Sequence, residues 1–321
     1  MWTEHFHFGD WLGLDAPSGS YKGSSREDFI ATAFYAHSTD LVIKAGRLIG
    51  KDIVEYEALR DRIVSAFRKA FPVYKTQTEH VLAVHFDLCE DRQQTADALA
   101  EMVIADGKQL RTGFVGTPYL LHVLSEYGHA DLAWDLLLRR EYPGWLYPVT
   151  KGATTIWEHW DGIKEDGTFW STDMNSFNHY AYGAVADWVF EQAAGIRHAE
   201  DQPGFAELIY EPHPDPRIGW LQARLDTRHG TVSALWVCEG DGVRYELKTP
   251  VRTLVCLNGR QRWVEKGSYT FYVENEYYYG STTVSVTGDR DVALSLTSSE
   301  LHCSFDEATK TLTVSGRGAM L

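Results

Sequence analysis

Apolar residues recur at helical spacing through the first two thirds of the chain. The first run spans residues 27–49 and predicts a helix with one apolar face, made of Ile30, Phe34, Leu41, Ala45 and Leu48. Similar runs predict further helices over residues 52–70, 76–89, 91–107, 117–128, 130–140 and 176–194. About seven helices joined by short turns indicate antiparallel hairpins in series, as in a bundle, a solenoid or an α/α toroid. The chain has no repeat of fixed period, which disfavours a simple solenoid.

Three capping boxes mark the starts of predicted helices. In each, a short polar residue precedes a Glu or Gln by three positions, so that its side chain can accept from a free N–H of the first turn. The pairs are Ser24 with Glu27, Thr76 with Glu79, and Asp91 with Gln94. A long stretch without helical period, residues 141–172, interrupts the series and is predicted to be a loop.

The pattern changes to alternation after the proline-rich segment 211–216. Short alternating runs separated by turn pairs such as Asn258-Gly259 predict strands over residues 232–237, 243–247, 253–257 and 268–273. Weaker alternation predicts three more strands over 281–286, 292–296 and 311–314. We therefore predict an antiparallel β-sandwich. The expected domains are residues 1–200, mainly helical, and residues 201–321.

Composition and sequence patterns disfavour some classes of partner and indicate a cellular compartment. The formal charge of −15 disfavours nucleic acid, whose phosphates such a surface repels. The apolar runs are too short to cross a bilayer, and the N-terminus lacks a signal-peptide pattern, so we expect a cytoplasmic protein without a membrane partner. Neither the four cysteines nor His5 and His7 have the spacing of a metal site. We expect free thiols, no metal and no cofactor.

The predicted loop contains the densest chemistry of the chain. Two tryptophans, two carboxylates and a histidine follow one another from Trp157 through Glu158, His159 and Trp160 to Asp161. A carboxylate between indoles is shielded from water, which tends to raise its pKa and suits acid–base chemistry. Sugars fit such a site, because their C–H faces stack on rings while their hydroxyls bind carboxylates. The alternative is a loop whose tryptophans fill a core.

Six blocks, in order, resemble the α-L-rhamnosidases of glycoside hydrolase family 78. They are Phe8–Leu12, Lys75–Thr78, Thr112–Pro118, Trp145–Pro148, Gly152–Gly162 and Met174–Gly183. The resemblance covers roughly residues 5–273 and implies the C-terminal portion of such an enzyme. It implies a fold made of a helical-hairpin domain, resembling an incomplete (α/α)6 toroid, followed by the β-sandwich. About half of the toroid's helices have no counterpart in the chain.

The resemblance also implies site residues. The general base that activates water falls on Glu158, and the sugar-contacting histidine falls on His179. Trp11 matches an aromatic wall of the rhamnose pocket. Beside these, Trp157, Trp160 and Asp161 are candidates for substrate binding. The implied activity is hydrolysis of a terminal α-L-rhamnoside with inversion.

The family's general-acid block has no match in this chain, which begins seven residues before Phe8. We expect the acid to come from Asp10, which follows Gly9 in a loop, or from a second chain. Asp10 could equally be a turn or capping aspartate. Asp161 could orient Glu158 or cap a turn.

Three readings stay open at this stage. The chain could be a shortened glycosidase, with altered specificity such as β-glucosidase activity if its acid is not the family's. It could be a catalytically impaired carbohydrate-binding remnant. Because an incomplete toroid exposes apolar helix faces, we also expect a homo-oligomer that covers the open side.

Overall fold

A computed structural model describes residues 5–199, 201–274, 277–285, 301–306 and 311–317. The chain forms two compact units, Met1–Val185 and Ala186–Leu321. The expected domain boundary was residue 200. The compact units divide inside the last helical segment, and the domain boundary at residue 200 stays a prediction.

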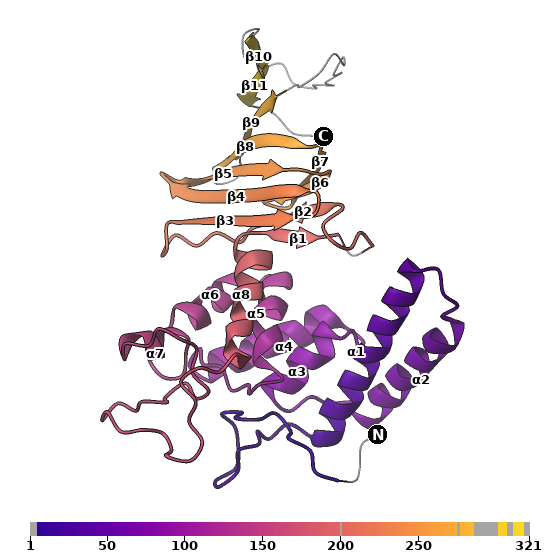
Figure 1. Ribbon diagram of the computed structural model, residues 1–321, viewed down its shortest axis with the longest axis vertical. Coiled ribbons are helices and arrows are strands. Elements are labelled where there is room, and N and C mark those ends of the chain that lie inside the picture. The colour runs from indigo at the N-terminus through magenta and orange to yellow at the C-terminus, as the bar shows by residue number, and fades with distance from the viewer. Residues whose placement is uncertain (1–4, 200, 275–276, 286–300, 307–310, 318–321) are drawn as a thin grey trace. The chain divides into compact units, whose positions relative to one another are not determined.

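The first unit is built from helical hairpins (Figure 1). Its helices are α1 (Glu27–Leu48), α2 (Val54–Ala70), α3 (Gln77–His85), α4 (Arg92–Ala105), α5 (Thr117–Glu126), α6 (Ala130–Leu138) and α7 (Leu146–Thr150). Helix α1 packs on α2, α3 on α4, and α5 on α6. Eight of the nine residues of α3 are buried, so α3 lies in the core of the unit. These contacts confirm the predicted hairpins. The short helix α7 lies in the stretch that we predicted to be a loop.

The prediction of one helix over residues 176–194 was wrong at its start. The chain is irregular as far as Tyr180 and then forms a 3-10 turn (Ala181–Ala184), α8 (Val185–Trp188) and a π turn (Val189–Ala193). The physical reason is that residues 176–179 form backbone hydrogen bonds with the loop that contains Glu158. The carbonyl of Ser176 accepts from the Glu158 N–H, and the His179 N–H donates to the Ile156 carbonyl. Backbone groups used in this way are not available to a helix.

The N-cap hydrogen bond is confirmed in two of the three predicted capping boxes. Thr76 accepts from the Glu79 N–H, and Asp91 accepts from the Gln94 N–H. The third was wrong, because the Ser24 hydroxyl donates to the carbonyl of Asp15 instead. The residue before α1 is Arg26, which has no side-chain cap of its own.

The apolar face that we predicted for α1 is only partly buried. Ile30 is buried, but Leu41 and Leu48 are each more than half exposed. The buried stripe runs through Phe29, Ala33, Ala36 and Ile43 instead. Helix α1 packs on α2 and α3 along this neighbouring stripe, which leaves part of the predicted face in solvent.

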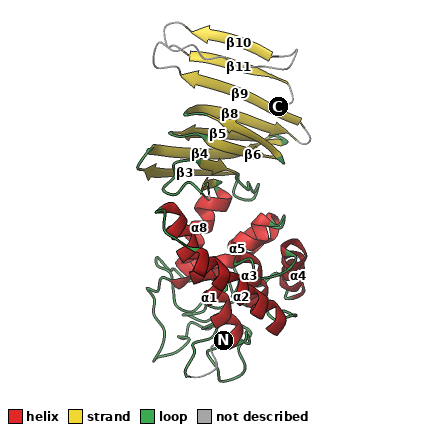
Figure 2. Ribbon diagram, turned by 90° about the vertical axis from the view of Figure 1, so that its right-hand side faces the viewer, coloured by secondary structure: helices red, strands yellow, loops and turns green. Residues whose placement is uncertain are grey.

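The second unit contains two sheets (Figure 2). The smaller has the order β1-β2-β6-β7, from Ile196–His198, Leu208–Tyr210, Thr253–Leu257 and Arg260–Val264. The larger has the order β10-β11-β9-β8-β5-β4-β3, from Leu301–Asp306, Thr311–Arg317, Tyr277–Ser285, Gly267–Glu274, Gly242–Thr249, Gly230–Glu239 and Trp220–Thr227. Among the described residues, every strand pair is antiparallel except β2 with β6, which is parallel.

The predicted antiparallel β domain is therefore confirmed. Alternation places Trp236, Leu247 and Phe271 in its core, each almost fully buried. The strand predicted over residues 292–296 lies outside the described residues. Within the described part of the chain, no helix is long and apolar enough to cross a membrane. Cys89, Cys238 and Cys256 are free thiols.

One buried carboxylate fixes the start of α1 against α3. The Glu79 side chain is fully buried and accepts from the guanidinium and the backbone N–H of Arg26, and from the Lys75 N–H. Burial alone would raise the pKa of Glu79. The hydrogen bonds from Arg26 and Lys75 outweigh it, so the pKa lies below its ordinary value.

We predict that Glu79→Gln destabilises the first unit by about 3 kcal/mol, because it removes the buried carboxylate that is the charge partner of the part-buried Arg26 guanidinium. Urea unfolding followed by circular dichroism measures the change. Glu57→Gln removes an exposed pair with Arg47 and should cost less than about 1 kcal/mol. Since the folded pKa of Glu79 is lowered, its contribution should be present above pH 4.5 and lost as pH falls through that pKa. Equal costs for the two variants would contradict the prediction.

Candidate active site

Asp10 ties the N-terminal loop to the centre of the helical unit. Its carboxylate is 1% exposed and accepts from the Thr78 hydroxyl and from the backbone N–H groups of Gly113 and Val115. Its carbonyl oxygen accepts from Gly13 and Gly23. Asp10 therefore joins the segment around itself to the start of α3 and to the loop before α5. This arrangement suits anchoring more than proton donation to a ligand.

The surroundings of Asp10 leave no room for a side chain at Gly113. A Cβ atom there would lie 2.3 Å from the Trp11 carbonyl oxygen and 2.7 Å from the Asp10 carboxylate. Burial raises the pKa of Asp10 to about 6, although the hydrogen bonds from Thr78, Gly113 and Val115 oppose the rise.

Glu158 is held by the backbone rather than by a side chain. Its N–H donates to the Ser176 carbonyl at 2.8 Å, and its carboxylate accepts from the Ser176 N–H at 2.9 Å. The residue is half-buried, so Glu158 keeps some accessible surface while the Ser176 N–H orients its carboxylate. A water-activating base needs both properties.

The same backbone pairing brings His179 next to the Glu158 segment. The His179 N–H donates to Ile156, and its ring stacks on Phe114 with centroids 5.0 Å apart. The Ala181 N–H donates to Nδ1 of His179. A neutral ring therefore has its proton on Nε2, which can donate to a ligand oxygen.

The tryptophans of the loop pack against protein rings. Trp157 is 5% exposed and meets Phe177 edge-on, and Trp160 is 4% exposed and stacks on Tyr182 at 3.9 Å. Trp11 is half-buried and contacts Tyr21 at 5.4 Å. Of these three indoles, Trp11 has the most accessible surface. The substrate-binding roles of Trp157 and Trp160 stay predictions.

A cavity of about 190 Å³ opens between two loops. One is the N-terminal loop, residues 5–26, and the other is the stretch after α7, residues 151–172, which we call the tryptophan loop. Trp160 and Asp161 line the cavity, together with Tyr21, His159, Trp170 and Tyr182. Burial raises the pKa of Asp161 and lowers that of His159. Three buried atoms of lining residues have no hydrogen-bond partner among the described residues: His159 Nε2, Trp160 Nε1 and the Tyr182 hydroxyl. Such groups are usually satisfied by water or by a bound molecule.

Three of these residues were not predicted from the sequence. Tyr182 lies in the Met174–Gly183 block but was given no role, although its aromatic ring was a visible signal. Tyr21 had no motif around it. Ser176 acts through its backbone, which no sequence pattern reveals.

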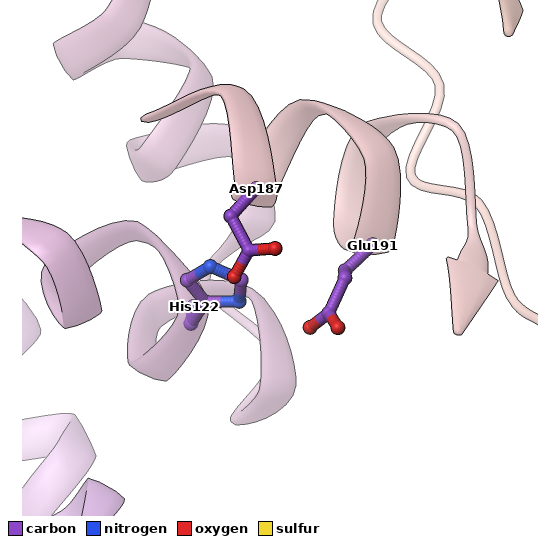
Figure 3. Close-up of side chains that lie close together, drawn as sticks. All are labelled: His122, Asp187 and Glu191. Atoms are coloured by element: carbon purple, nitrogen blue, oxygen red, sulfur yellow. The ribbon is translucent and has the colours of Figure 1, made fainter. Parts of the chain in front are cut away.

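Acidic side chains also occur together in the second unit. Asp187 and Glu191 project from the same side of the segment that contains α8 and the π turn (Figure 3). His122, shown with them, belongs to α5 of the first unit. Each of the three has another interaction partner in the described chain. An acidic pair four residues apart is an ordinary solvated helix face, and we assign no metal to it.

Residues 1–193 match the family described as the bacterial alpha-L-rhamnosidase 6 hairpin glycosidase domain. Residues 195–270 match the bacterial alpha-L-rhamnosidase C-terminal domain. This chain belongs to the bacterial α-L-rhamnosidase family. The predicted resemblance is thus confirmed at the level of the family.

Curated α-L-rhamnosidases agree with this assignment. That of Streptomyces avermitilis is 38% identical over 254 residues, covering 77% of this chain and 24% of the relative. One from Formosa agariphila is 37% identical over 257 residues, covering 77% of this chain and 28% of the relative. The chain therefore spans about a quarter of the length of these relatives.

Two solved α-L-rhamnosidase structures share the fold. The S. avermitilis enzyme, complexed with L-rhamnose, has a TM-score of 0.72 and 31% identity, covering 97% of this chain and 27% of that chain. The Aspergillus terreus enzyme has a TM-score of 0.77 and 28% identity, covering 84% and 33%. Both units of this chain therefore have counterparts in known rhamnosidases.

We predict that Gly113→Ala disrupts the Asp10 anchor and destabilises the helical unit by more than about 2 kcal/mol, because its methyl group would overlap backbone atoms. Gly183→Ala is the matched control, since its Cβ would meet only Ile156, at an ordinary 3.6 Å. Thermal unfolding compares the two. A Gly113→Ala protein as stable as the control would refute the close packing.

We also predict a pH dependence from Asp10. Its folded pKa of about 6 exceeds the ordinary 3.8, so the folded state binds the proton more tightly. The free energy of unfolding should therefore fall as pH rises from about 4 to about 6, by on the order of 3 kcal/mol from this group. Urea titrations of wild type and Asp10→Asn isolate the effect, because the variant should lose this slope. Identical slopes would show that Asp10 does not titrate in this range.

Proposed function

We propose that this chain supplies the base side of an α-L-rhamnosidase active site. Glu158 activates a water that attacks the anomeric carbon of a terminal α-L-rhamnoside, and the sugar is released with inversion. His179 binds a sugar hydroxyl through Nε2, and Trp11 forms a wall of the pocket. The observation that supports this most is the half-buried residue Glu158, whose carboxylate is oriented by the Ser176 N–H.

Inversion also needs an acid, with the two carboxyls roughly 6.5–9.5 Å apart so that a water fits at the base. Asp10 was our candidate within the chain. The burial of Asp10 and the three groups that donate to its carboxylate favour a role in anchoring the N-terminal loop. We therefore propose that the general acid comes from another polypeptide chain or segment. Separately from the acid, the exposed part of α1 around Leu41 and Leu48 is a surface that a second copy of this chain would cover.

The second candidate function is carbohydrate binding without hydrolysis. The burial and hydrogen bonding of Asp10 favour this second function, because they leave the chain without the candidate general acid that the sequence suggested. Loss of a general acid typically costs 10²–10⁴-fold in rate. The wall and the hydrogen-bonding groups around Glu158 would still hold a sugar.

We predict that Glu158→Gln lowers kcat on a nitrophenyl α-L-rhamnoside by about 10²–10⁴-fold, since the amide cannot accept the water's proton. L-rhamnose affinity, measured by calorimetry, should change much less. Glu165→Gln, on the exposed part of the same loop, is the control and should retain activity.

The outcomes separate the two functions. Rhamnose binding by a wild type that releases no nitrophenol would support binding alone. Hydrolysis that Glu158→Gln leaves intact would exclude Glu158 as the base. Hydrolysis of a β-glucoside but not of the rhamnoside would exclude the proposed sugar.

A further inference from the structure

Six aromatic rings form a continuous line across the two loops of the site. Starting from the N-terminus, the centroid separations are 4.9, 5.7, 5.4, 5.9 and 3.7 Å, and the rings are Phe6, Phe8, Trp11, Tyr21, Trp170 and His159. We call this line the aromatic row. Both loops lie at the end of the helical unit where α1 begins (Figure 1).

The two ends of the aromatic row differ in exposure. Phe6 is 65% and Phe8 63% exposed, whereas His159 is buried. The inner three rings, Tyr21, Trp170 and His159, also line the cavity beside Asp161. The row therefore leads from solvent into a cavity whose lining residues include unpaired buried polar groups.

The size of the cavity limits what enters it. About 190 Å³ corresponds to about six waters at about 30 Å³ each, which is the scale of one sugar ring. The row extends well beyond it. A ligand that bound to both the cavity and the aromatic row would need one unit inside the cavity. Its further units would lie outside the cavity and would need flat apolar faces.

The net charge of the chain indicates whether such a ligand is acidic or neutral. The chain has a net charge of −15, which disfavours acidic polymers. One cation beside the row, Lys22, is paired with Glu27 at 2.7 Å and lies over the Phe6 ring. A neutral glycan needs no cation and can stack its C–H faces on rings.

We propose that the outer, exposed end of the aromatic row, Phe6 and Phe8, binds the part of a neutral oligosaccharide that follows its terminal sugar. The inference rests on the proposed function, because it places the terminal sugar in the cavity beside Trp160 and Asp161, which follow Glu158 in the chain, although Glu158, His179 and Trp11 are not among the residues that line this cavity. It adds that the substrates are chains of several neutral units, with Phe6 and Phe8 as the surface that holds the outer units.

The test compares the affinities of L-rhamnose and of a neutral, rhamnose-terminated trisaccharide by calorimetry. Wild type should bind the trisaccharide at least tenfold more tightly. Phe6→Ala and Phe8→Ala should each reduce this affinity ratio by about fivefold, because each removes one stacking ring. Tyr35→Ala is the control, since Tyr35 is 52% exposed on α1, outside the row, and should keep the ratio. An acidic trisaccharide, with a uronate as its second unit, should bind more weakly than the neutral one.

The failures are distinguishable. An equal affinity of wild type for both neutral ligands, or an unchanged ratio in Phe6→Ala and Phe8→Ala, would overturn the role of the row while leaving rhamnose binding intact. Sedimentation that shows a dimer lost in Phe8→Ala, with the ratio unchanged, would make the row a protein contact instead. No binding of L-rhamnose at all would contradict the proposed function itself.

Discussion

The arrangement of the site depends on the burial of one carboxylate. Asp10 accepts from Thr78, Gly113 and Val115, which lie 68, 103 and 105 residues away in the sequence. A buried acceptor of this kind is costly unless each donor is in place, so it fixes the segments that supply them. Trp11 follows directly, and through Tyr21 and Trp170 its position is coupled to the tryptophan loop. The buried Asp10 carboxylate thereby positions the ring of Trp11 and the rings in contact with it.

A second constraint acts on the other side of the site. The segment that contains Glu158 pairs with the segment that contains Ser176 and His179, and this pairing prevents a helix there. Glu158 and His179, 21 positions apart in sequence, are placed by the same few backbone hydrogen bonds. The proposed roles of Glu158 and His179 therefore rest on one shared backbone pairing, whereas the acid has no equivalent support in this chain.

The sequence predicted what depends on local periodicity and missed what depends on distant contacts. Helical spacing and the caps at Thr76 and Asp91 were sufficient for the hairpins, and alternation was sufficient for the β unit. The helix over 176–194 was wrong because long-range backbone pairing overrides local preference. The α1 face was wrong at Leu41 and Leu48, since apolar spacing does not reveal which of two neighbouring stripes meets a partner. The motif singled out Glu158, but it contains no information about the donors that surround Asp10.

The bond between Glu158 and the Ser176 N–H has an evolutionary consequence. Because the donor is a main-chain group, the side chain at position 176 can vary widely, with proline excluded since it has no N–H. Insertions or deletions in the stretch between the two residues would change the path of the chain and so misalign the Glu158 carboxylate. Selection on this site should therefore act on the length of that loop more strongly than on its composition.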